Sequence, residues 1–302
     1  MTDVIVRLKG ALGNQMFQYA FAKAVARKLN GRVLLDRSWL DLPNITETYR
    51  LDAFKLDMAL TSRVQNVIHR LLLNQRLPGP IRSTALAALS MDYEREDDQH
   101  LGQSLSTRYG KKPAKRIFCD GYFQRAEPIE HLLEDLREEF HLPVSSANCQ
   151  KMLDGIESCE SVAVHVRRGD YVDNVHVREN MGPVTLDYYV RGFELMRQQL
   201  KSPTFYVFSN DPTWVREKLA EGQEDIVVVD GGEAGSDLAD LALMRSCKHF
   251  IIANSTFSWW SAFLANNPDK IVLAPKPWFI LDHMGFDARV PADWIGIPSG
   301  LG

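Results

Sequence analysis

Residues 162–166 read VAVHV, and short apolar runs of the same kind return at 205–208 (FYVF), 226–229 (IVVV), 250–253 (FIIA) and 271–274 (IVLA). Segments with the periodicity of amphipathic helices separate these runs. We expect the helices at Thr185–Gln199, Thr213–Ala220, Asp237–Ser246 and Thr256–Ala265. Strands that alternate with helices in this way predict βαβ units and a parallel, doubly wound sheet.

The first half of the chain shows the same alternation less regularly. Its expected strands are Val4–Leu8, Arg32–Leu35 and Arg116–Cys119, and its expected helices are Gln15–Leu29, capped by Asn14, and Pro128–Phe140. The stretch 40–112 mixes prolines, charge clusters and weak helical patterns. We therefore expect helices and loops to be inserted there into a smaller α/β unit.

The two halves together predict an α/β protein with two Rossmann-like domains that face each other across a cleft. We place the N-terminal domain at residues 1–155 and the C-terminal domain at residues 156–302, since a polar stretch near 143–161 fits a boundary. In open parallel sheets, ligands bind beyond the carboxyl ends of the strands. Candidate functional residues are therefore sought where these strands end.

Composition excludes several classes of protein. The chain has 302 residues, with 35 Lys and Arg against 39 Asp and Glu, and its net charge is −4. This mild acidity argues against nucleic-acid binding, which usually shows as a basic surface. No run approaches about 18 apolar residues, so no membrane span is expected. The four cysteines lack the spacing of a zinc site and are expected to be reduced thiols.

The segment HVRRGDYV, residues 165–172, places a histidine, two arginines and an acid at the end of a buried strand. Because alternate residues of a strand share a face, His165 and Arg167 point one way and Arg168 points the other. Arginine suits a phosphate, to which its planar fork donates two parallel hydrogen bonds. The alternative is a structural ion pair between Asp170 and one of the two arginines.

Three further segments end a strand or begin a helix, where amides and the helix dipole favour anions. They are GALGNQ (10–15), FSNDP (208–212) and ANSTFSWW (253–260). Each also has a structural interpretation, as tight packing, a turn or a helix cap. Upstream of the last segment, Asp237 and Asp240 lie one helical turn apart and point toward the same sheet edge.

Two observations limit the chemistry of these segments. We expect Trp259, Trp260 and Phe263 to pack in the core rather than to form a platform for sugar. No Asp-x-Asp triplet occurs in the chain, although enzymes that neutralise a nucleotide diphosphate with a divalent cation need such oxygen ligands. We therefore expect no metal and no cofactor, and arginine with helix dipoles would neutralise a diphosphate instead.

Four segments together resemble the motifs of the α-1,2-fucosyltransferases. They are GALGNQMFQYAFA, HVRRGDYV, FSNDPTW and DLALMRSCKHFIIANSTFSWW, which occur in the same order, and the resemblance spans most of the chain from Gly10 to Trp278. It implies metal-independent, inverting transfer of L-fucose from GDP-L-fucose to the 2-hydroxyl of a galactose-containing acceptor. The acceptor would be an oligosaccharide or a lipid-linked glycan. It also implies a GT-B-like architecture in which the C-terminal half holds the donor.

The resemblance also implies roles for particular residues. Arg167 would grip the β-phosphate of the donor, and His165 would lie near the nucleotide. The remaining donor contacts are expected at Ser209, Asp211, Asp240, Ser255, Thr256 and Ser258, and from the other domain at Gly13 and Asn14. The inverting reaction allows a carboxylate to deprotonate the acceptor hydroxyl. Asp170 is the candidate for this base, with Asp173 and His176 behind it. The stretch 40–112 matches no motif and is expected to shape acceptor choice.

The residues leave alternatives open. An α-1,6- or protein O-fucosyltransferase would share the HVRR arginines, and a non-catalytic module would bind the nucleotide sugar without releasing GDP. An NAD-linked oxidoreductase would fit the sheet, but the glycine fingerprint is missing. We expect a cytoplasmic enzyme of surface-glycan synthesis that can associate peripherally with the inner face of the membrane without spanning it.

Overall fold

A computed structural model describes residues 1–72, 77–96, 115–144, 146–169, 171, 174–229, 237–281 and 285–301, with only the backbone of 176 and 177. The chain divides into two compact units, unit 1 at Met1–Phe140 and unit 2 at His141–Gly302. Each unit has its own parallel sheet. We describe the two units separately.

Unit 1 contains a five-stranded sheet in the order β3-β2-β1-β5-β4, and all of its neighbouring strands are parallel. The strands are β1 (Asp3–Arg7), β2 (Arg32–Asp36), β3 (Ala59–Leu60), β4 (Met91–Arg95) and β5 (Arg116–Asp120). The helices are α1 (Leu12–Leu29), α2 (Arg63–Leu72), α3 (Gly79–Ala88) and α5 (Leu133–Glu139), with 3-10 turns at Leu51–Ala53 and Glu130–Leu132.

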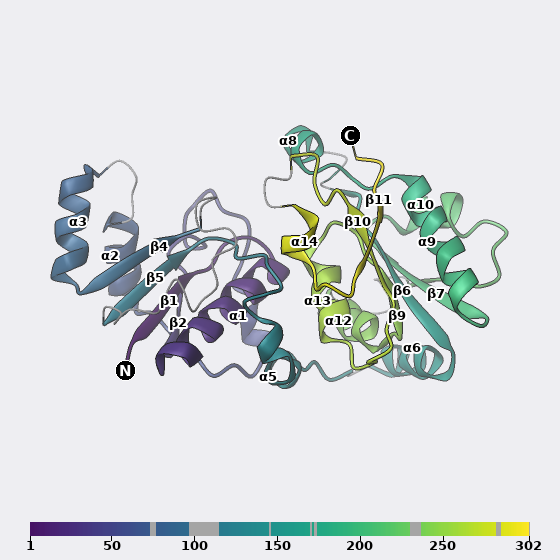
Figure 1. Cartoon of the computed structure of the whole chain (residues 1–302), viewed down its shortest axis with the longest axis horizontal. Coiled ribbons are helices and arrows are strands. Elements are labelled where there is room, and N and C mark those ends of the chain that lie inside the picture. Colours follow the sequence, from purple (N-terminus) through teal and green to yellow (C-terminus); the bar gives the residue numbers. More distant parts are fainter. Residues whose placement is uncertain are drawn as a thin grey trace. The chain divides into compact units, whose positions relative to one another are not determined.

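The core of unit 1 forms because helices cover both faces of this sheet. Leu86 of α3 and Leu89, which follows this helix, pack with Ile5, Leu34 and Phe118 on one face. Helix α1 packs against β1 and β2 and is buried on nearly all of its sides, since the run Gln15–Ala22 is buried without a break. Figure 1 shows α1 running alongside β1 and β2.

Unit 2 contains a six-stranded sheet in the order β11-β10-β9-β6-β7-β8, again with parallel neighbours. The strands are β6 (Glu160–Val166), β7 (Pro203–Ser209), β8 (Ile226–Val229), β9 (His249–Ile251), β10 (Val272–Lys276) and β11 (Ile295–Pro298). The helices are α6 (Ala147–Ser158), α8 (Val175–Asn180), α9 (Leu186–Gln199), α10 (Pro212–Lys218), α12 (Asp237–Ser246), α13 (Thr256–Leu264) and α14 (Phe286–Arg289).

Strand β6 lies at the centre of unit 2, and its two faces contact different helices. Val164 and Val166 pack with residues of α9 and α10, such as Tyr189 and Val215, in one buried cluster. Helices α6, α12 and α13 pack together on the other side of the strands (Figure 1). His165 lies between two buried valines and points toward this second side, where its ring meets Phe257 of α13.

The predicted parallel α/β architecture is confirmed, and every predicted strand is present, with ends shifted by a few residues. Trp259, Trp260 and Phe263 are core residues, as expected. The four cysteines are free. No helix in the described part of the chain is long and apolar enough to cross a membrane.

Two local expectations were wrong. Asn14 does not cap α1, because the helix already begins at Leu12 with Ala11 as its N-cap. The expected helix Pro128–Phe140 is a 3-10 turn followed by the short helix α5. The two units meet at Phe140–His141, earlier than the expected boundary at 155, because α6 packs on β6 and α12 and so lies within unit 2.

Candidate functional site

The carboxyl ends of β6 and β9 form the point in unit 2 where the order of the strands reverses. From β6 the chain builds outward through β7 and β8, and then returns to the other side of β6 through β9, β10 and β11. In doubly wound sheets the crevice at such a point is the usual place for a ligand. The segment that follows β6 carries Arg167, and the segment that follows β9 leads into α13.

His165 and Arg167 lie at this carboxyl end of β6. His165 is only 6% exposed, and its ring centroid is 5.6 Å from that of Phe257. Its buried Nδ1 atom has no hydrogen-bond partner. Burial, with a smaller contribution from the Arg167 charge, lowers the pKa of His165 to about 3, so the imidazole is neutral at pH 7. Arg167 is partly exposed, and its guanidinium lies 6.0 Å from the ring of Tyr171.

Arg168 makes a different set of contacts, all of them internal. Its Nε atom donates to Asp211 Oδ2 at 3.2 Å, and its guanidinium lies over Trp214, 4.2 Å from the ring centroid. Its backbone amide donates to Asn210 Oδ1 at 2.9 Å. Arg168 therefore forms an ion pair with Asp211, whereas the ion pair expected with Asp170 lies outside the described residues.

Ser209 and Asp211, both expected to contact the donor, already have structural partners at the end of β7. Ser209 Oγ donates to the carbonyl of Val166 at 2.9 Å and accepts from the Asp211 amide at 2.9 Å. Asp211 caps α10 by accepting from the Trp214 amide at 3.1 Å. These two side chains shape the edge that carries Arg167.

The N-terminus of α13 lies beside His165. Ser255 is its N-cap residue, with its side chain 3.4 Å from the Phe257 amide, and Thr256 is the first residue of the helix. Ser258 is fully buried, and its hydroxyl donates to the carbonyl of Ser255 at 3.3 Å. The start of α13 therefore offers partial positive charge next to β6.

Asn254 connects this helix start to the loop after β6. Its carbonyl accepts from the Tyr171 hydroxyl at 3.0 Å, and its Nδ2 atom donates to the carbonyl of Gly182 at 2.8 Å. Its Oδ1 atom is buried without a partner. Tyr171 also lies against Arg167, so a continuous series of contacts joins Arg167 to the start of α13.

Asp240 lies in the first turn of α12, which packs against α13. Its Oδ1 atom is buried and has no partner. Burial and the neighbouring charge of Asp237 raise the pKa of Asp240 to about 6. A carboxylate in these surroundings is costly until it receives hydrogen-bond donors, so Asp240 is a strong candidate for a ligand contact.

In unit 1, the predicted residues Gly13 and Asn14 lie in the first turn of α1. Gly10 precedes them with a φ of 70°, and a Cβ at this position would collide with the side-chain Nδ2 atom of Asn14. Asn14 Oδ1 accepts from Gln124 Nε2 at 2.9 Å. The glycine-rich turn is therefore held closely against α1 and the segment after β5.

Sequence reasoning missed two buried glutamines on α1 that hold the loops at this edge of unit 1. Gln15 Nε2 donates to the carbonyls of Gly10 and Thr48, and its Oε1 accepts from the Arg50 amide at 3.0 Å. Gln18 bonds the backbone of Lys9 and Gly121. The signal was present in the sequence as two polar residues within an apolar helical stripe.

A charged cluster that was not expected from the sequence lies at the carboxyl ends of β1 and β5. Asp120 pairs with Arg7 at 3.1 Å and with Lys9, and accepts from the Tyr93 hydroxyl at 3.0 Å. Burial alone would raise the pKa of Asp120, but Arg7 and Lys9 outweigh it and lower the pKa below its usual value. Asp120 is therefore ionised at neutral pH, and the positive charges of Arg7 and Lys9 lie beside it.

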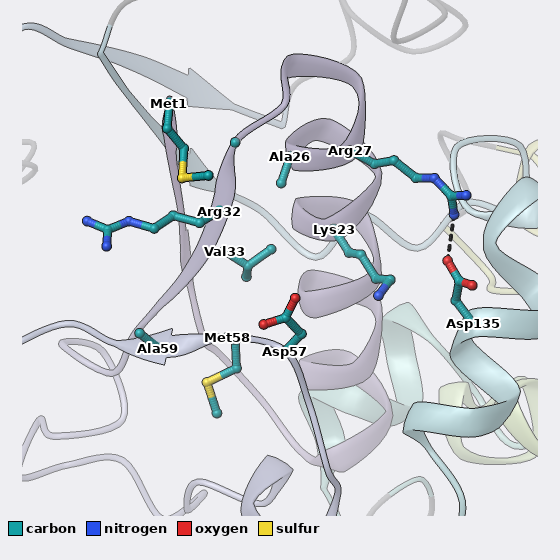
Figure 2. Close-up of a pocket in the computed structure, with 11 residues that line it drawn as sticks. Met1, Lys23, Ala26, Arg27, Arg32, Val33, Asp57, Met58, Ala59 and Asp135 are labelled. Carbon is teal, nitrogen blue, oxygen red and sulfur yellow. Dashed lines mark hydrogen bonds and ion pairs between the residues drawn. The ribbon is translucent and has the colours of Figure 1, made fainter.

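A pocket of about 480 Å³ lies at the opposite, amino-terminal edge of the unit 1 sheet. Figure 2 shows that it is lined by cationic and acidic side chains from α1, β2, α5 and the segment before β3. Its cations have acidic partners: Arg27 pairs with Asp135 at 2.5 Å, and Lys23 pairs with Glu139 at 2.8 Å. The pocket lies away from the strand ends where ligands bind in such sheets.

The expected base Asp170, and Asp173 behind it, lie outside the described residues, as does the side chain of His176. Within the described ranges, no three His, Cys, Asp or Glu side chains are grouped so that they could hold a metal ion. Of the residues predicted in unit 2, the structure brings together His165, Arg167 and the start of α13 at one edge.

Comparison with known proteins adds a family assignment. The family model described as "Glycosyl transferase family 11" matches residues 2–298. An alpha-1,2-colitosyltransferase of Escherichia coli is 28% identical over 98% of this chain and 99% of its own length. The O-antigen biosynthesis glycosyltransferase WbnK of Escherichia coli is 31% identical over 90% of this chain and 93% of its own length. The galactoside alpha-(1,2)-fucosyltransferase 2 of Rattus norvegicus is 31% identical over 97% of this chain and 76% of its own length.

Solved structures of fucosyltransferases share the fold. Arabidopsis thaliana FUT1, as a variant in complex with GDP, gives a TM-score of 0.55 with 16% identity over 96% of this chain and 74% of that chain. The fucosyltransferase NodZ from Bradyrhizobium gives a TM-score of 0.50 with 14% identity over 86% of this chain and 91% of that chain. At these identities the likeness concerns the fold alone.

Proposed function

The chain belongs to glycosyl transferase family 11 and is a glycosyltransferase, and from this premise we propose that it transfers L-fucose from GDP-L-fucose to the 2-hydroxyl of a galactose-containing acceptor. The acceptor would be an oligosaccharide or lipid-linked glycan of the cell surface. Relatives named as galactoside alpha-(1,2)-fucosyltransferases and as an O-antigen glycosyltransferase support this choice.

The observation that carries the proposal is the positive edge where β6 and β9 end. Arg167 and the N-terminus of α13 are connected there through Tyr171 and Asn254. A diphosphate at this edge would receive the guanidinium fork and the amides of a helix start, which together suit phosphate oxygens. Arg168 is held by Asp211, so Arg167 is the arginine assigned to the ligand.

Cleavage of the bond between the sugar and the diphosphate leaves negative charge on the phosphate. Arg167 and the start of α13 would stabilise this charge as it grows, and so bind the transition state more tightly than the donor. The neutral His165 would donate or accept a hydrogen bond here without adding charge. Inversion needs one direct displacement by the acceptor hydroxyl, for which Asp170 is the proposed base.

Recognition of the guanine base is assigned to Asp240. A carboxylate accepts well from two neighbouring N–H donors, and the guanine ring presents such a pair. The unpartnered Oδ1 atom of Asp240 supports this role. The same proposal includes a GT-B-like arrangement, in which Gly13 and Asn14 approach the diphosphate from unit 1.

A second sugar is favoured by one comparison. The relative that matches over 98% of this chain is named as a colitosyltransferase, so activated colitose is the competing donor. Both sugars would use the same diphosphate edge, because the leaving group is shared. Residues that contact the sugar ring would discriminate between fucose and colitose.

The decisive experiment incubates the protein with GDP-fucose or the activated colitose donor and a panel of β-galactosides, and records GDP release and the product linkage by NMR. We expect an α-1,2 linkage to galactose, formed equally well in EDTA, because protein cations stabilise the leaving group. A product on N-glycan or peptide acceptors alone would favour the α-1,6- or protein O-fucosyltransferase alternative. Stoichiometric binding without GDP release would favour a non-catalytic module, and an absolute need for a divalent cation would refute the leaving-group mechanism.

A further inference from the structure

Helix α2 presents apolar side chains to solvent and two polar side chains, Asn66 and His69, to the protein. Val64 and Leu71 are 68% and 60% exposed, whereas Asn66 and His69 are only 6% and 3% exposed. This is the reverse of the arrangement that a surface helix of a globular protein normally adopts. The reversal therefore needs an explanation.

Buried contacts fix this orientation of α2. His69 Nδ1 lies 2.5 Å from Asp36 Oδ2, and Asp36 is fully buried at the end of β2. The His69 ring also packs edge-on against Phe118 at 4.9 Å, and Asn66 bonds the Thr61 hydroxyl. Turning the helix to bury its valines would leave these polar groups without partners, which is costly. The outward apolar face is thus a stable feature of the fold.

The exposed apolar residues form one continuous stripe. Val64, Val67, Ile68 and Leu71 recur at the spacing of a single helix face, and all four are exposed. Helix α3, which packs beside α2, adds Ile81 with 58% exposure. We call these five residues the α2–α3 face, and Figure 1 shows the two helices as neighbours. Apolar patches of this kind mark interaction sites.

The charge around the α2–α3 face is entirely positive along the sequence. Residues 58–91 contain four arginines and neither Asp nor Glu, although the whole chain has a net charge of −4. Arg63 and Arg70 are exposed and lie two helical turns apart, along one edge of the apolar stripe. Apolar residues bordered by arginines on one helix are typical of segments that lie in the interface of an anionic membrane.

We propose that the α2–α3 face docks on the surface of an anionic lipid bilayer. Val64, Ile68 and Leu71 would enter the boundary between headgroups and acyl chains, and Arg63 and Arg70 would contact lipid phosphates. A second copy of this chain is a poorer occupant, because a symmetric contact would bring like charges together. This proposal does not depend on the identity of the donor, and it gives a physical basis for action on a membrane-linked acceptor.

The test is flotation of the full-length protein with vesicles of phosphatidylcholine, either alone or with about 30 mol% phosphatidylglycerol. We expect binding only to the anionic vesicles and a fall in binding as salt increases. The triple variant Val64→Ser, Ile68→Ser, Leu71→Ser should bind about tenfold more weakly or worse. The double variant Arg63→Gln, Arg70→Gln should lose about fivefold for each arginine.

The matched control is the double variant Leu186→Ser, Val190→Ser, which removes two exposed apolar side chains from α9 in unit 2. It should bind vesicles like the unaltered protein. All variants should keep the same melting temperature and the same affinity for GDP, which separates membrane docking from folding and donor binding. No flotation of the unaltered protein, equal flotation of the triple variant, or a dimer that the triple variant dissociates would each overturn the proposal.

Discussion

Arg167 and Arg168 are adjacent arginines with different surroundings. Arg168 is held by Asp211 and by stacking on Trp214. Arg167 follows the same strand end but lies near the ring of Tyr171, and its charge contributes to the lowered pKa of His165. The alternation of side chains along an extended chain is the reason that two identical residues take such different places.

We expect Arg167→Lys to lower kcat by about a hundredfold or more, because a lysine cannot supply the two parallel hydrogen bonds to a phosphate. The melting temperature should change little, since Arg167 is partly exposed. Arg168→Lys is the matched control: it should lower the melting temperature while keeping most of kcat. Steady-state GDP release and thermal unfolding of both variants measure this. Equal losses of kcat in the two variants would contradict the assignment.

Asp240 should determine the choice of base in the donor. The carboxylate would accept from two N–H groups of guanine, one of which is missing in hypoxanthine. We expect the protein to bind GDP at least about tenfold more tightly than IDP, and Asp240→Asn to remove most of this preference. Titration calorimetry with GDP and IDP measures both ratios. Asp237→Asn is the control, and its GDP-to-IDP ratio should stay unchanged.

The same residue predicts how donor binding depends on pH. Burial and Asp237 raise the pKa of Asp240 to about 6, and guanine binds only the ionised carboxylate. Below about pH 6 a proton must be removed before binding, so KM for GDP-fucose should rise as pH falls, by about tenfold for each pH unit. In Asp237→Asn the rise should begin at a lower pH. A KM for GDP-fucose that is constant between pH 5 and pH 7 would exclude Asp240 from the donor site.

At the scale of elements, helix α1 organises the carboxyl edge of unit 1 through its polar residues. Gln15 is fully buried and makes three hydrogen bonds to backbone groups of distant segments. Gln15→Leu would remove all three hydrogen bonds, including the buried one to the carbonyl of Gly10. We expect a loss of about 2–4 kcal/mol in the free energy of unfolding, measured by urea denaturation.

The control for Gln15 is Gln150→Leu, which replaces an exposed glutamine on α6 whose Nε2 atom donates to Asp154 Oδ1 at 2.9 Å. Its free energy of unfolding should stay within about 0.5 kcal/mol of the original. If Gln15→Leu were equally mild, the turn that contains Gly10 would be held by packing alone. A fall in kcat of Gln15→Leu at a temperature where it is folded would link this turn to the reaction.

Most elements could be predicted because their periodicity is strong. The strands of unit 2 are short, continuous runs of β-branched residues, which predict buried parallel strands directly. Strands β3 and β4 could not be predicted in this way. Ala59–Leu60 is only two residues long, and Met91–Arg95 is rich in charge because it lies at the edge of its sheet. Helix α2 was obscured because its apolar residues face solvent.

The candidate site was predicted less completely than the fold. Charge at a strand end pointed to Arg167, and a capping pattern pointed to Ser255. Neither signal shows whether a side chain already has a hydrogen-bond partner within the protein. Ser209 and Asp211 were therefore expected to contact the donor, although both form hydrogen bonds with backbone groups of the protein. Such pairing depends on residues far apart in the chain, which sequence patterns of short range do not contain.

At the scale of the whole molecule, two sheet edges are candidates for the ligand-binding site. The carboxyl edge of unit 2 has unpartnered buried atoms on His165, Asp240 and Asn254, which a ligand could satisfy. The amino-terminal edge of unit 1 has a cavity of about 480 Å³ (Figure 2), but its Arg27 and Lys23 are paired with acids. The unpartnered buried atoms therefore favour the carboxyl edge of unit 2 as the place where a ligand binds.

Hydrogen–deuterium exchange with and without GDP distinguishes the two edges in the intact protein. A bound nucleotide stabilises the segments that it contacts, so we expect slower exchange in peptides that cover 165–171 and 254–260. If unit 1 also approaches the diphosphate, peptides over 10–18 should be protected by GDP-fucose. Peptides over 23–33 line the pocket and should exchange at an unchanged rate. Protection confined to 23–33 would move the donor to the pocket of unit 1.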